Sequence, residues 1–392
     1  MKTTFLFVAR FIAIALAIAV LYGFQNTLFT HLNGYYQVIV LNAGIAVILA
    51  VSLNLVNGIT GQFSLGHAGF AAIGAYGSAY FTKEIGGQLL DPLSFILGIT
   101  LGAVLAGIAG LLVGLPSLRL RGDYLAIVTL GFNQIIISII RNLEVVGGAA
   151  GYSDIPLYTT FAWVWGLALL CILSIRNLAV SELGRSMRAI RDDEIAAEAA
   201  GINTTRIKVL SFVYSAMWAG VAGALQVHFL QSATPEGFTF VQSIEVVVSV
   251  VLGGLGSITG SALAGMGLTI LQEALREVPG AFYTGVVLVF VSFYWNFTKL
   301  RAEKQLNRAS LVRGIIIPAV SLALLLGLYF YPSARTFLES NKSALRYVIY
   351  SLILIVVMLL RPQGLLGRRE WSFAGLQRAF NLGSGRDPRI NG

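Results

Sequence analysis

This sequence contains few side chains of the types that catalyse reactions or bind metals, and the spacing of those few suits neither role. The chain contains three histidines, His31, His67 and His228, and one cysteine, Cys171. Histidines so far apart offer no metal-ligand spacing, and a single cysteine forms neither a disulfide framework nor a thiolate site. No Gly-Lys dipeptide occurs, so the chain has no P-loop to bind nucleotide phosphates. We therefore predict a protein that is not an enzyme and that holds no metal and no cofactor of its own.

A glycine-rich stretch, residues 58–77, carries polar side chains at the edge of an apolar run. They are Gln62, Ser64 and His67. Such a stretch can interrupt a membrane helix, because polar side chains and neighbouring helices satisfy the freed backbone groups where they line a cavity. We interpret these three residues as candidates for a translocation pathway. The alternative is a glycine-rich packing helix with one histidine at the membrane interface.

Two adjacent amides, Asn133 and Gln134, interrupt another apolar run. Polar amides at membrane depth cost free energy unless they are hydrogen-bonded, so they usually face the interior of a bundle. Both are therefore further candidates for the pathway. The alternative is a hydrogen bond between helices, worth roughly 1 kcal/mol.

The loop at residues 177–208 mixes acidic and basic residues with alanines. Residues 184–200 are good helix formers, Gly201 suits the left-handed residue that ends a helix, and Asn203 or Thr204 can cap the next one. We predict a helix, a sharp turn and a second helix that together dock a partner, with a solvated loop as the alternative. The candidate docking residues are Arg185, Arg188, Arg191, Glu194, Ala196, Ala197, Glu198 and Gly201.

Composition places these features in a membrane protein. The 392 residues are 56% hydrophobic and 11% charged, whereas soluble domains carry roughly 25% charged residues. A spanning helix needs about 20 apolar residues. We predict an all-α, polytopic transmembrane bundle of about 10–12 membrane segments, some of them re-entrant or broken. The candidate segments are residues 5–24, 36–56, 63–82, 93–115, 124–140, 160–176, 207–231, 242–256, 258–276, 281–297, 314–331 and 345–360.

Basic residues set the orientation of these segments. They gather at residues 119–121, 176–208, 299–313 and in the tail 368–392, and short basic loops remain in the cytoplasm. Both termini are then predicted to be cytoplasmic. The net charge of +9 follows from this topology, so no nucleic-acid partner is needed to explain it.

Small residues recur every four positions along several of the segments. Such stripes let helix backbones approach closely in lipid. The two longest stripes are Gly98, Gly102, Ala106, Gly110 and Gly114, and Ala216, Gly220 and Ala224. We expect Gly102 and Gly110 to bring two backbones into contact.

Five ordered blocks between about residues 38 and 367 carry a family resemblance. They read GITGQFSLGHAGFAAIGAY, LRLRGDYLAIVTLGF, GRSMRAIRDDEIAAEAAGIN, VVLGGLGSITG and RPQGLLG. The sequence resembles the permease subunits of branched-chain amino acid ABC transporters, of the LivM type. The resemblance implies residues 1–367 as a transmembrane permease domain, with a coupling loop at 177–208, and residues 368–392 as a basic tail.

The resemblance also implies the partners. These are a second related permease, two cytoplasmic ATPases that bind the ATP and Mg, and a periplasmic or lipid-anchored substrate-binding protein, all at a bacterial inner membrane. Other functions stay open on the sequence: a permease for urea or short amides, or a secondary transporter.

The sequence departs from the family in two places. Ile195 stands where the coupling motif of such permeases has an acidic residue, with Glu194 one position early. Residues 281–344 add two apolar segments before the final span. We interpret the addition as an extra hairpin, since a pair of spans returns the chain to the same side of the membrane.

Overall fold

The computed structural model describes residues 22–27, 29–117 and 123–276, together with the isolated residues Ser340, Ser351, Ile355, Gly364 and Gly367. The chain divides into two compact units, residues 1–266 with 361–392, and residues 267–360. Several predicted features lie outside the described residues, wholly or almost wholly. They are the segments 5–24, 281–297, 314–331 and 345–360, the hairpin 281–344 and the tail 368–392.

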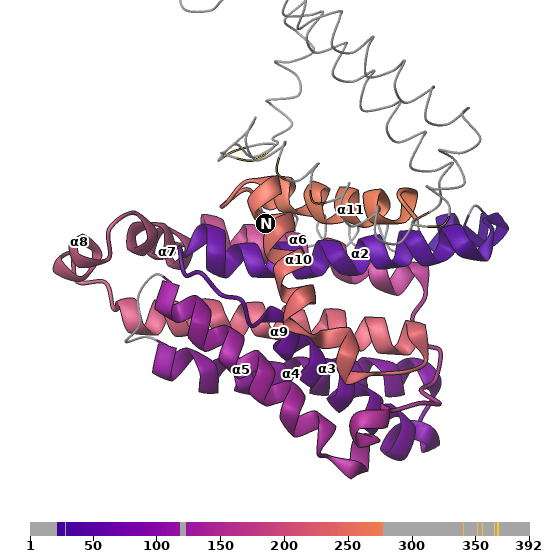
Figure 1. Ribbon diagram of the computed structural model, residues 1–392. Coiled ribbons are helices and arrows are strands. Elements are labelled where there is room, and N and C mark those ends of the chain that lie inside the picture. The colour runs from indigo at the N-terminus through magenta and orange to yellow at the C-terminus, as the bar shows by residue number, and fades with distance from the viewer. Residues whose placement is uncertain are drawn as a thin grey trace, which may run out of the picture. The chain divides into compact units, whose positions relative to one another are not determined.

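Long helices make up nearly all of the described chain. They are α2 (Gly34–Asn54), α3 (His67–Tyr80), α4 (Asp91–Ser117), α5 (Asp123–Arg141), α6 (Phe161–Val180), α9 (Thr204–Leu230), α10 (Phe240–Gly253) and α11 (Ile258–Ala274), which runs into the second unit. Two short helices, α7 (Glu182–Asp192) and α8 (Glu194–Ala199), connect α6 to α9. Figure 1 shows α2 and α6 in one layer and α3, α4, α5 and α9 in another, with α7 and α8 beyond one end.

Six of the described segments are long and apolar enough to cross a membrane. They are Gly34–Ile59, Asp91–Leu115, Tyr124–Arg141, Phe161–Val180, Thr204–Leu230 and Pro235–Gly253. Helices α3 and α11 are shorter, with 14 and 17 residues. The prediction of a polytopic helical bundle is confirmed, and among the described residues the only strand-like pairing is one isolated bridge between Tyr152 and Ala233.

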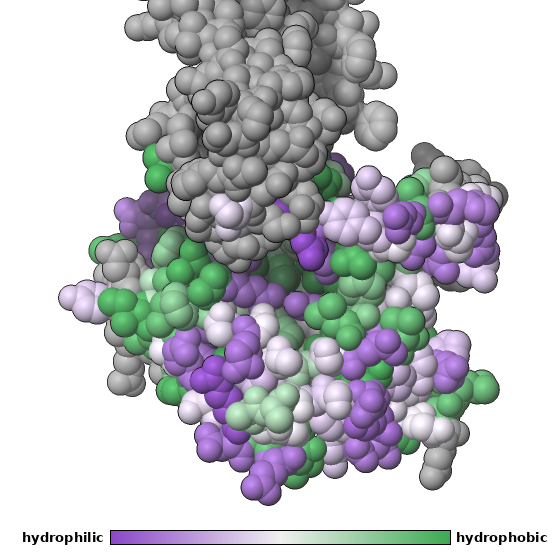
Figure 2. All heavy atoms as spheres, turned by 45° about the vertical axis from the view of Figure 1, so that its right-hand side comes forward, coloured by the Kyte–Doolittle hydropathy of each residue, from purple (hydrophilic) through white to green (hydrophobic). Residues whose placement is uncertain are grey.

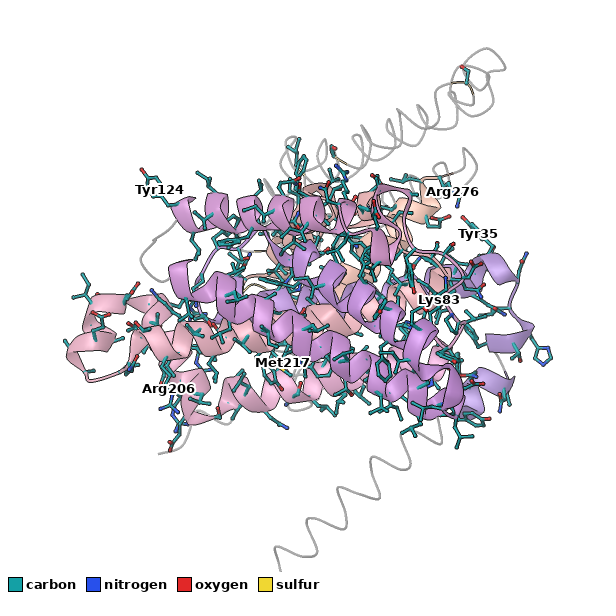
Figure 3. The ribbon with its side chains drawn as sticks, turned by 90° about the horizontal axis from the view of Figure 1, so that it is seen from below. Tyr35, Lys83, Tyr124, Arg206, Met217 and Arg276 are labelled. Carbon is teal, nitrogen blue, oxygen red and sulfur yellow. The ribbon has the colours of Figure 1, made fainter. Side chains whose placement is uncertain are left out.

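Side chains at the two ends of the bundle show how the helices alternate. Figure 3 places Tyr124 and Arg206, which open α5 and α9, at one end, and Tyr35 and Lys83 at the opposite end. Met217, halfway along α9, lies between them. Consecutive long helices therefore run in opposite directions, as a chain that crosses a membrane repeatedly must.

Small residues hold α3, α4 and α9 together. A Cβ on Gly102 would lie 2.5 Å from the carbonyl oxygen of Gly74, and one on Gly110 would lie 2.6 Å from the Cβ of Ala216. A Cβ on Gly220 would in turn lie 2.9 Å from the carbonyl oxygen of Gly102. The predicted stripes therefore meet each other, and the expectation for Gly102 and Gly110 is confirmed.

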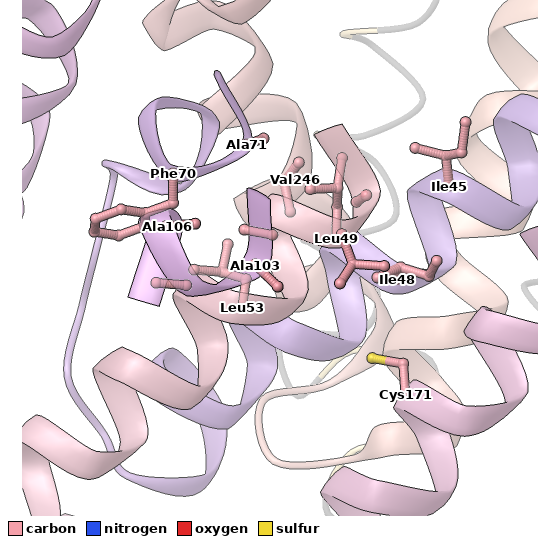
Figure 4. Packing of buried hydrophobic residues seen from close by; sticks show 14 of the residues in the cluster. Ile45, Ile48, Leu49, Leu53, Phe70, Ala71, Ala103, Ala106, Cys171 and Val246 are labelled. Atoms are coloured by element: carbon pink, nitrogen blue, oxygen red, sulfur yellow. The ribbon is translucent and has the colours of Figure 1, made fainter. Parts of the chain in front are cut away.

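Larger apolar side chains fill the space between the two layers. Ile48 and Leu53 of α2 are fully buried, as is Cys171 of α6, and Figure 4 labels all three side chains within the packed core. Cys171 is packed as a small apolar residue within the described bundle. Outside the core, Figure 2 shows hydrophobic and hydrophilic residues interspersed over the visible face of the described bundle.

Candidate functional site

The connection between α2 and α3 is the most irregular part of the membrane-embedded chain. After α2 the backbone widens into a π-helical turn, η2 (Leu55–Ile59), turns at Gly61 with φ of +77°, and has no regular secondary structure up to Gly66, before α3 begins. π-Helical turns occur frequently at functional sites. The predicted interruption is thus present, but it lies before α3 and shortens that helix.

Side chains satisfy the backbone groups that this interruption leaves without helical partners. The Asn57 Nδ2 donates to the Ser64 carbonyl oxygen over 3.3 Å, and the Ser64 N–H donates to Asn57 Oδ1 over 3.1 Å. The Leu65 N–H donates to the Thr129 hydroxyl of α5 over 2.9 Å. Asn57 and Thr129 were missed by the sequence analysis, although a polar residue inside an apolar run next to glycines is a signal that could have found them.

The three predicted pathway residues of this segment lie inside the bundle. Gln62, Ser64 and His67 are 5%, 2% and 2% exposed. The Gln62 Nε2 donates to the Ser211 hydroxyl of α9 over 3.2 Å, and His67 Nε2 lies 2.9 Å from Ser52 Oγ of α2. Gln62 and His67 thereby link the interrupted segment to α9 and α2, whereas the Ser64 hydroxyl accepts a hydrogen bond from the Gly66 N–H within the segment.

The two adjacent amides of α5 point to different surroundings. Asn133 is fully buried, and a Cβ on Gly69 in the first turn of α3 would lie 2.8 Å from its Oδ1. Neither amide atom of Asn133 has a hydrogen-bond partner. Gln134 is exposed. Only Asn133 joins the cluster around the start of α3, so the structure separates two residues that the sequence placed together.

Gln134 and Ser138 are polar residues on an exposed face of α5 that also carries the exposed isoleucines Ile127, Ile135 and Ile139. We define the α5 stripe as the exposed residues Tyr124, Ile127, Gln134 and Ser138. The outer face of α4 is different, because its exposed residues from 93 to 115 are leucine, isoleucine and valine except for Thr100. The Thr100 hydroxyl donates to a carbonyl of its own helix over 2.7 Å. An unpaired glutamine amide is costly in hydrocarbon, so the α5 stripe suits a polar environment.

The predicted docking loop folds as two helices where one was expected before Gly201. Asp193 has extended backbone between α7 and α8, and its Oδ1 accepts hydrogen bonds from the N–H groups of Ile195 and Ala196 at 2.9 and 3.1 Å. This cap starts a new helix, so the expectation of one continuous helix over 184–200 was wrong. Gly201 has a φ of +83° and Asn203 caps α9, as predicted.

Four of the docking residues hold this pair of helices, the α7–α8 elbow, to the bundle. Arg191 Nη1 donates to the carbonyl oxygen of Gly58 over 3.2 Å, and Glu194 pairs with Lys208 of α9 at 2.5 Å. The Thr204 hydroxyl donates to Glu198 Oε1 over 2.7 Å, and Ala197 is buried.

The other four docking residues lie on the outer surface of the elbow. Arg185, Arg188, Ala196 and Gly201 are exposed. Arg188 reaches back to the Ala179 carbonyl over 3.0 Å, and Arg185 makes a loose surface pair with Glu182 at 3.7 Å. Ile195, which replaces the expected acid, is 67% exposed. The tip of the elbow, residues 193–201, therefore exposes small and apolar residues together with the carboxylates of Asp193 and Glu198.

At the opposite end of the bundle, the loops between helices also pack together. The Tyr152 hydroxyl donates to Glu84 Oε1 over 2.7 Å, and Lys83 lies over the Tyr152 ring and donates to the Ser153 carbonyl. Burial, and then the Glu84 carboxylate, raise the pKa of Tyr152 above its ordinary value. The ring therefore remains a neutral hydrogen-bond donor.

Comparison with known proteins assigns the chain to a family. Residues 35–294 match the family described as "Branched-chain amino acid transport system / permease component". The chain belongs to this family. The matched range includes the interrupted segment, the α5 stripe and the α7–α8 elbow of the permease.

Individual relatives agree with the family. The permease is 38% identical over 268 residues to the high-affinity branched-chain amino acid transport system permease protein LivM of Salmonella typhimurium, covering 59% of this chain and 62% of the relative. Identity to LivM of Escherichia coli is also 38%, and to LivH of E. coli 25% over 262 residues, covering 61% of this chain and 84% of LivH. The chain thus spans about three fifths of the LivM proteins. No solved structure matches it.

Proposed function

We propose that this permease is the membrane-spanning subunit of an ATP-driven importer for branched-chain amino acids, in a bacterial inner membrane with both termini in the cytoplasm. The observation that carries the proposal is the α7–α8 elbow, which joins an exposed tip to the interrupted membrane segment through Arg191. Such an element suits a chain that receives energy from a partner. The family match and the names of the LivM and LivH relatives support the substrate class.

The complex that we propose contains four further components. They are a related second permease, two ATPases that bind ATP and Mg, and a substrate-binding protein on the outer side. The tip of the elbow would enter the ATPase, and the packed loops around Tyr152 would face the binding protein. This chain performs no chemistry of its own in that scheme.

Uptake by the reconstituted complex tests the proposal. Proteoliposomes that contain this permease, its partner permease, both ATPases and the binding protein should accumulate labelled leucine when ATP is supplied on the cytoplasmic side. Isoleucine and valine should compete, whereas urea and acetamide should not. Uptake by the permease alone without ATP would instead indicate a secondary transporter, and competition by urea alone would indicate the short-amide alternative.

The α5 stripe provides the part of the pathway that we assign. Gln134 and Ser138 lie outside the packed core on a helix that spans the membrane, so we propose that they face the second permease across a polar passage. Gln134→Leu should lower leucine uptake at an unchanged membrane level of the complex. Thr100→Val, a matched loss of polarity on the apolar face of α4, should have no effect. Equal uptake by the two variants would place the α5 stripe against lipid.

A further inference from the structure

Three segments that are distant in the sequence meet at the base of the elbow. They are the end of the π-helical turn at Gly58, the tight turn between α10 and α11, and the last turn of α7. The Gly256 N–H of the second segment donates to Asn54 Oδ1 over 2.9 Å, and a Cβ on Gly58 would overlap the Gly256 nitrogen. The π-helical turn and the α10–α11 turn, residues 254–257, are therefore in direct backbone contact, and we call them the two interruptions.

The side chain of Arg191 lies between these two interruptions. Its Nη1 donates to the carbonyl oxygen of Gly58 over 3.2 Å. A Cβ on Gly61 would lie 2.6 Å from Arg191 Cγ, and one on Gly256 would lie 3.1 Å from Nη1. Although it is charged, the side chain is only 19% exposed. Glycine is thus required on both sides of the Arg191 side chain.

A neighbouring carboxylate fixes the direction of the guanidinium. Arg191 Nε and Nη2 both donate to Asp192 Oδ1, at 3.2 and 3.1 Å. Because the guanidinium is planar, these two bonds leave Nη1 directed at Gly58. A lysine ammonium has no such fork, so it could keep the charge but would not reproduce this orientation.

The backbone on both sides of Arg191 is suited to movement. Gly61, Gly254 and Gly256 have φ values of +77°, +111° and +89°, a region in which only glycine is free of strain. Interruptions of this kind absorb large backbone changes in domain movements. The exposed tip of the elbow lies only a few residues along the chain from Arg191.

We propose that Arg191 is the positioning residue that transmits movement of the α7–α8 elbow to both interruptions at once. It acts through the backbone of Gly58 and Gly256 and does not contact the substrate. The inference rests on the proposed function, because it presumes that an ATPase moves the elbow. The inference predicts that, without the Arg191 side chain, ATP hydrolysis is no longer coupled to transport.

The test compares Arg191→Met, Arg191→Lys and the control Arg176→Met in the complete reconstituted complex. Arg176 is exposed at the end of α6, outside the elbow. The quantity measured is leucine taken up per ATP hydrolysed. We expect Arg191→Met to assemble, to hydrolyse ATP and to lower this ratio about tenfold, equivalent to the loss of about 1.4 kcal/mol, in the range of one hydrogen bond to a charged group. Arg191→Lys should fall between, and the control should match the wild type.

An unchanged ratio in Arg191→Met would overturn the inference, as would a parallel fall of assembly, hydrolysis and uptake that leaves the ratio intact. If Arg191→Met fails to assemble, the variant Gly256→Ala tests the inference in its place. Its added Cβ would press on Arg191 Nη1 while the arginine itself remains. Gly256→Ala should lower the ratio of leucine taken up to ATP hydrolysed. In the double variant with Arg191→Lys, it should lower the ratio little further. A normal ratio in Gly256→Ala, or fully additive effects in the double variant, would refute the role of Arg191. Absence of ATP-dependent uptake in the wild-type complex would remove the proposed function itself.

Discussion

The contact between α3 and α9 gives the sharpest prediction, because one added methyl group has no space there. In the variant Gly74→Ala, the new Cβ would overlap the Cα of Gly220 and lie 2.6 Å from its carbonyl carbon. Both atoms belong to the backbone, so no side chain can rotate away. Carbon atoms make favourable contact near about 3.5 Å, so the two helices must separate by roughly 1 Å. A gap of that size forfeits a quarter to a half of the attraction between the facing atoms.

Overpacking of this kind costs about 1–3 kcal/mol and occasionally more. We expect Gly74→Ala to be at the upper end of that range, about 3 kcal/mol, since α4 packs on the same contact through Gly102. The assay measures the apparent melting temperature of the detergent-solubilised permease. Samples are heated, and the remaining folded protein is measured by size-exclusion chromatography. Gly131→Ala on α5 is the matched control, because a Cβ there meets nothing within 4 Å. If the two variants have the same melting temperature, the reasoning from the close approach of α3 and α9 is refuted.

Three further experiments test the elbow and the topology. Gly201→Val should weaken co-purification of the ATPase several-fold, while membrane insertion stays normal. The space around Gly201 is open, but a β-branched residue at φ of +83° is strained by about 1–2 kcal/mol. Unaltered co-purification would contradict this prediction. Lys208→Met should remove the 2.5 Å ion pair with Glu194, at a cost of roughly 2 kcal/mol since Glu194 is partly exposed, and limited proteolysis of the elbow should become faster. In a background without the native cysteine, a cysteine at Glu182 should react only from the cytoplasm and one at Asp154 only from outside, and the reverse result would invert the topology.

The sequence predicted the helices and their closest contacts well, because both depend on local patterns. Apolar runs of about 20 residues and small residues at every fourth position are repetitive signals, and Gly102 and Gly110 lie where the pattern placed them. The left-handed residue at Gly201 was predictable for the same reason, since it follows a run of good helix formers.

Details that depend on a single side chain were harder to predict. The break between α7 and α8 arises from the Asp193 cap, in a stretch whose propensities favour one helix. Asn133 and Gln134 were grouped because they are adjacent, yet adjacent residues of a helix lie about 100° apart around its axis, and only Gln134 is exposed. The contact of Arg191 with Gly58 joins residues far apart in the sequence, which no local pattern reports.

The backbone contacts among α3, α4 and α9 also limit how the permease can deform. Where glycines bring main chains together, the interface has no long side chains whose rotamers could accommodate sliding, so the three helices form one rigid body. A movement that passes through the bundle must then be a rotation or translation of this body as a whole. Its mechanical freedom lies at its borders, in the irregular residues 61–66 and in the loops that enter α4 and α9. The permease therefore has few ways to change shape.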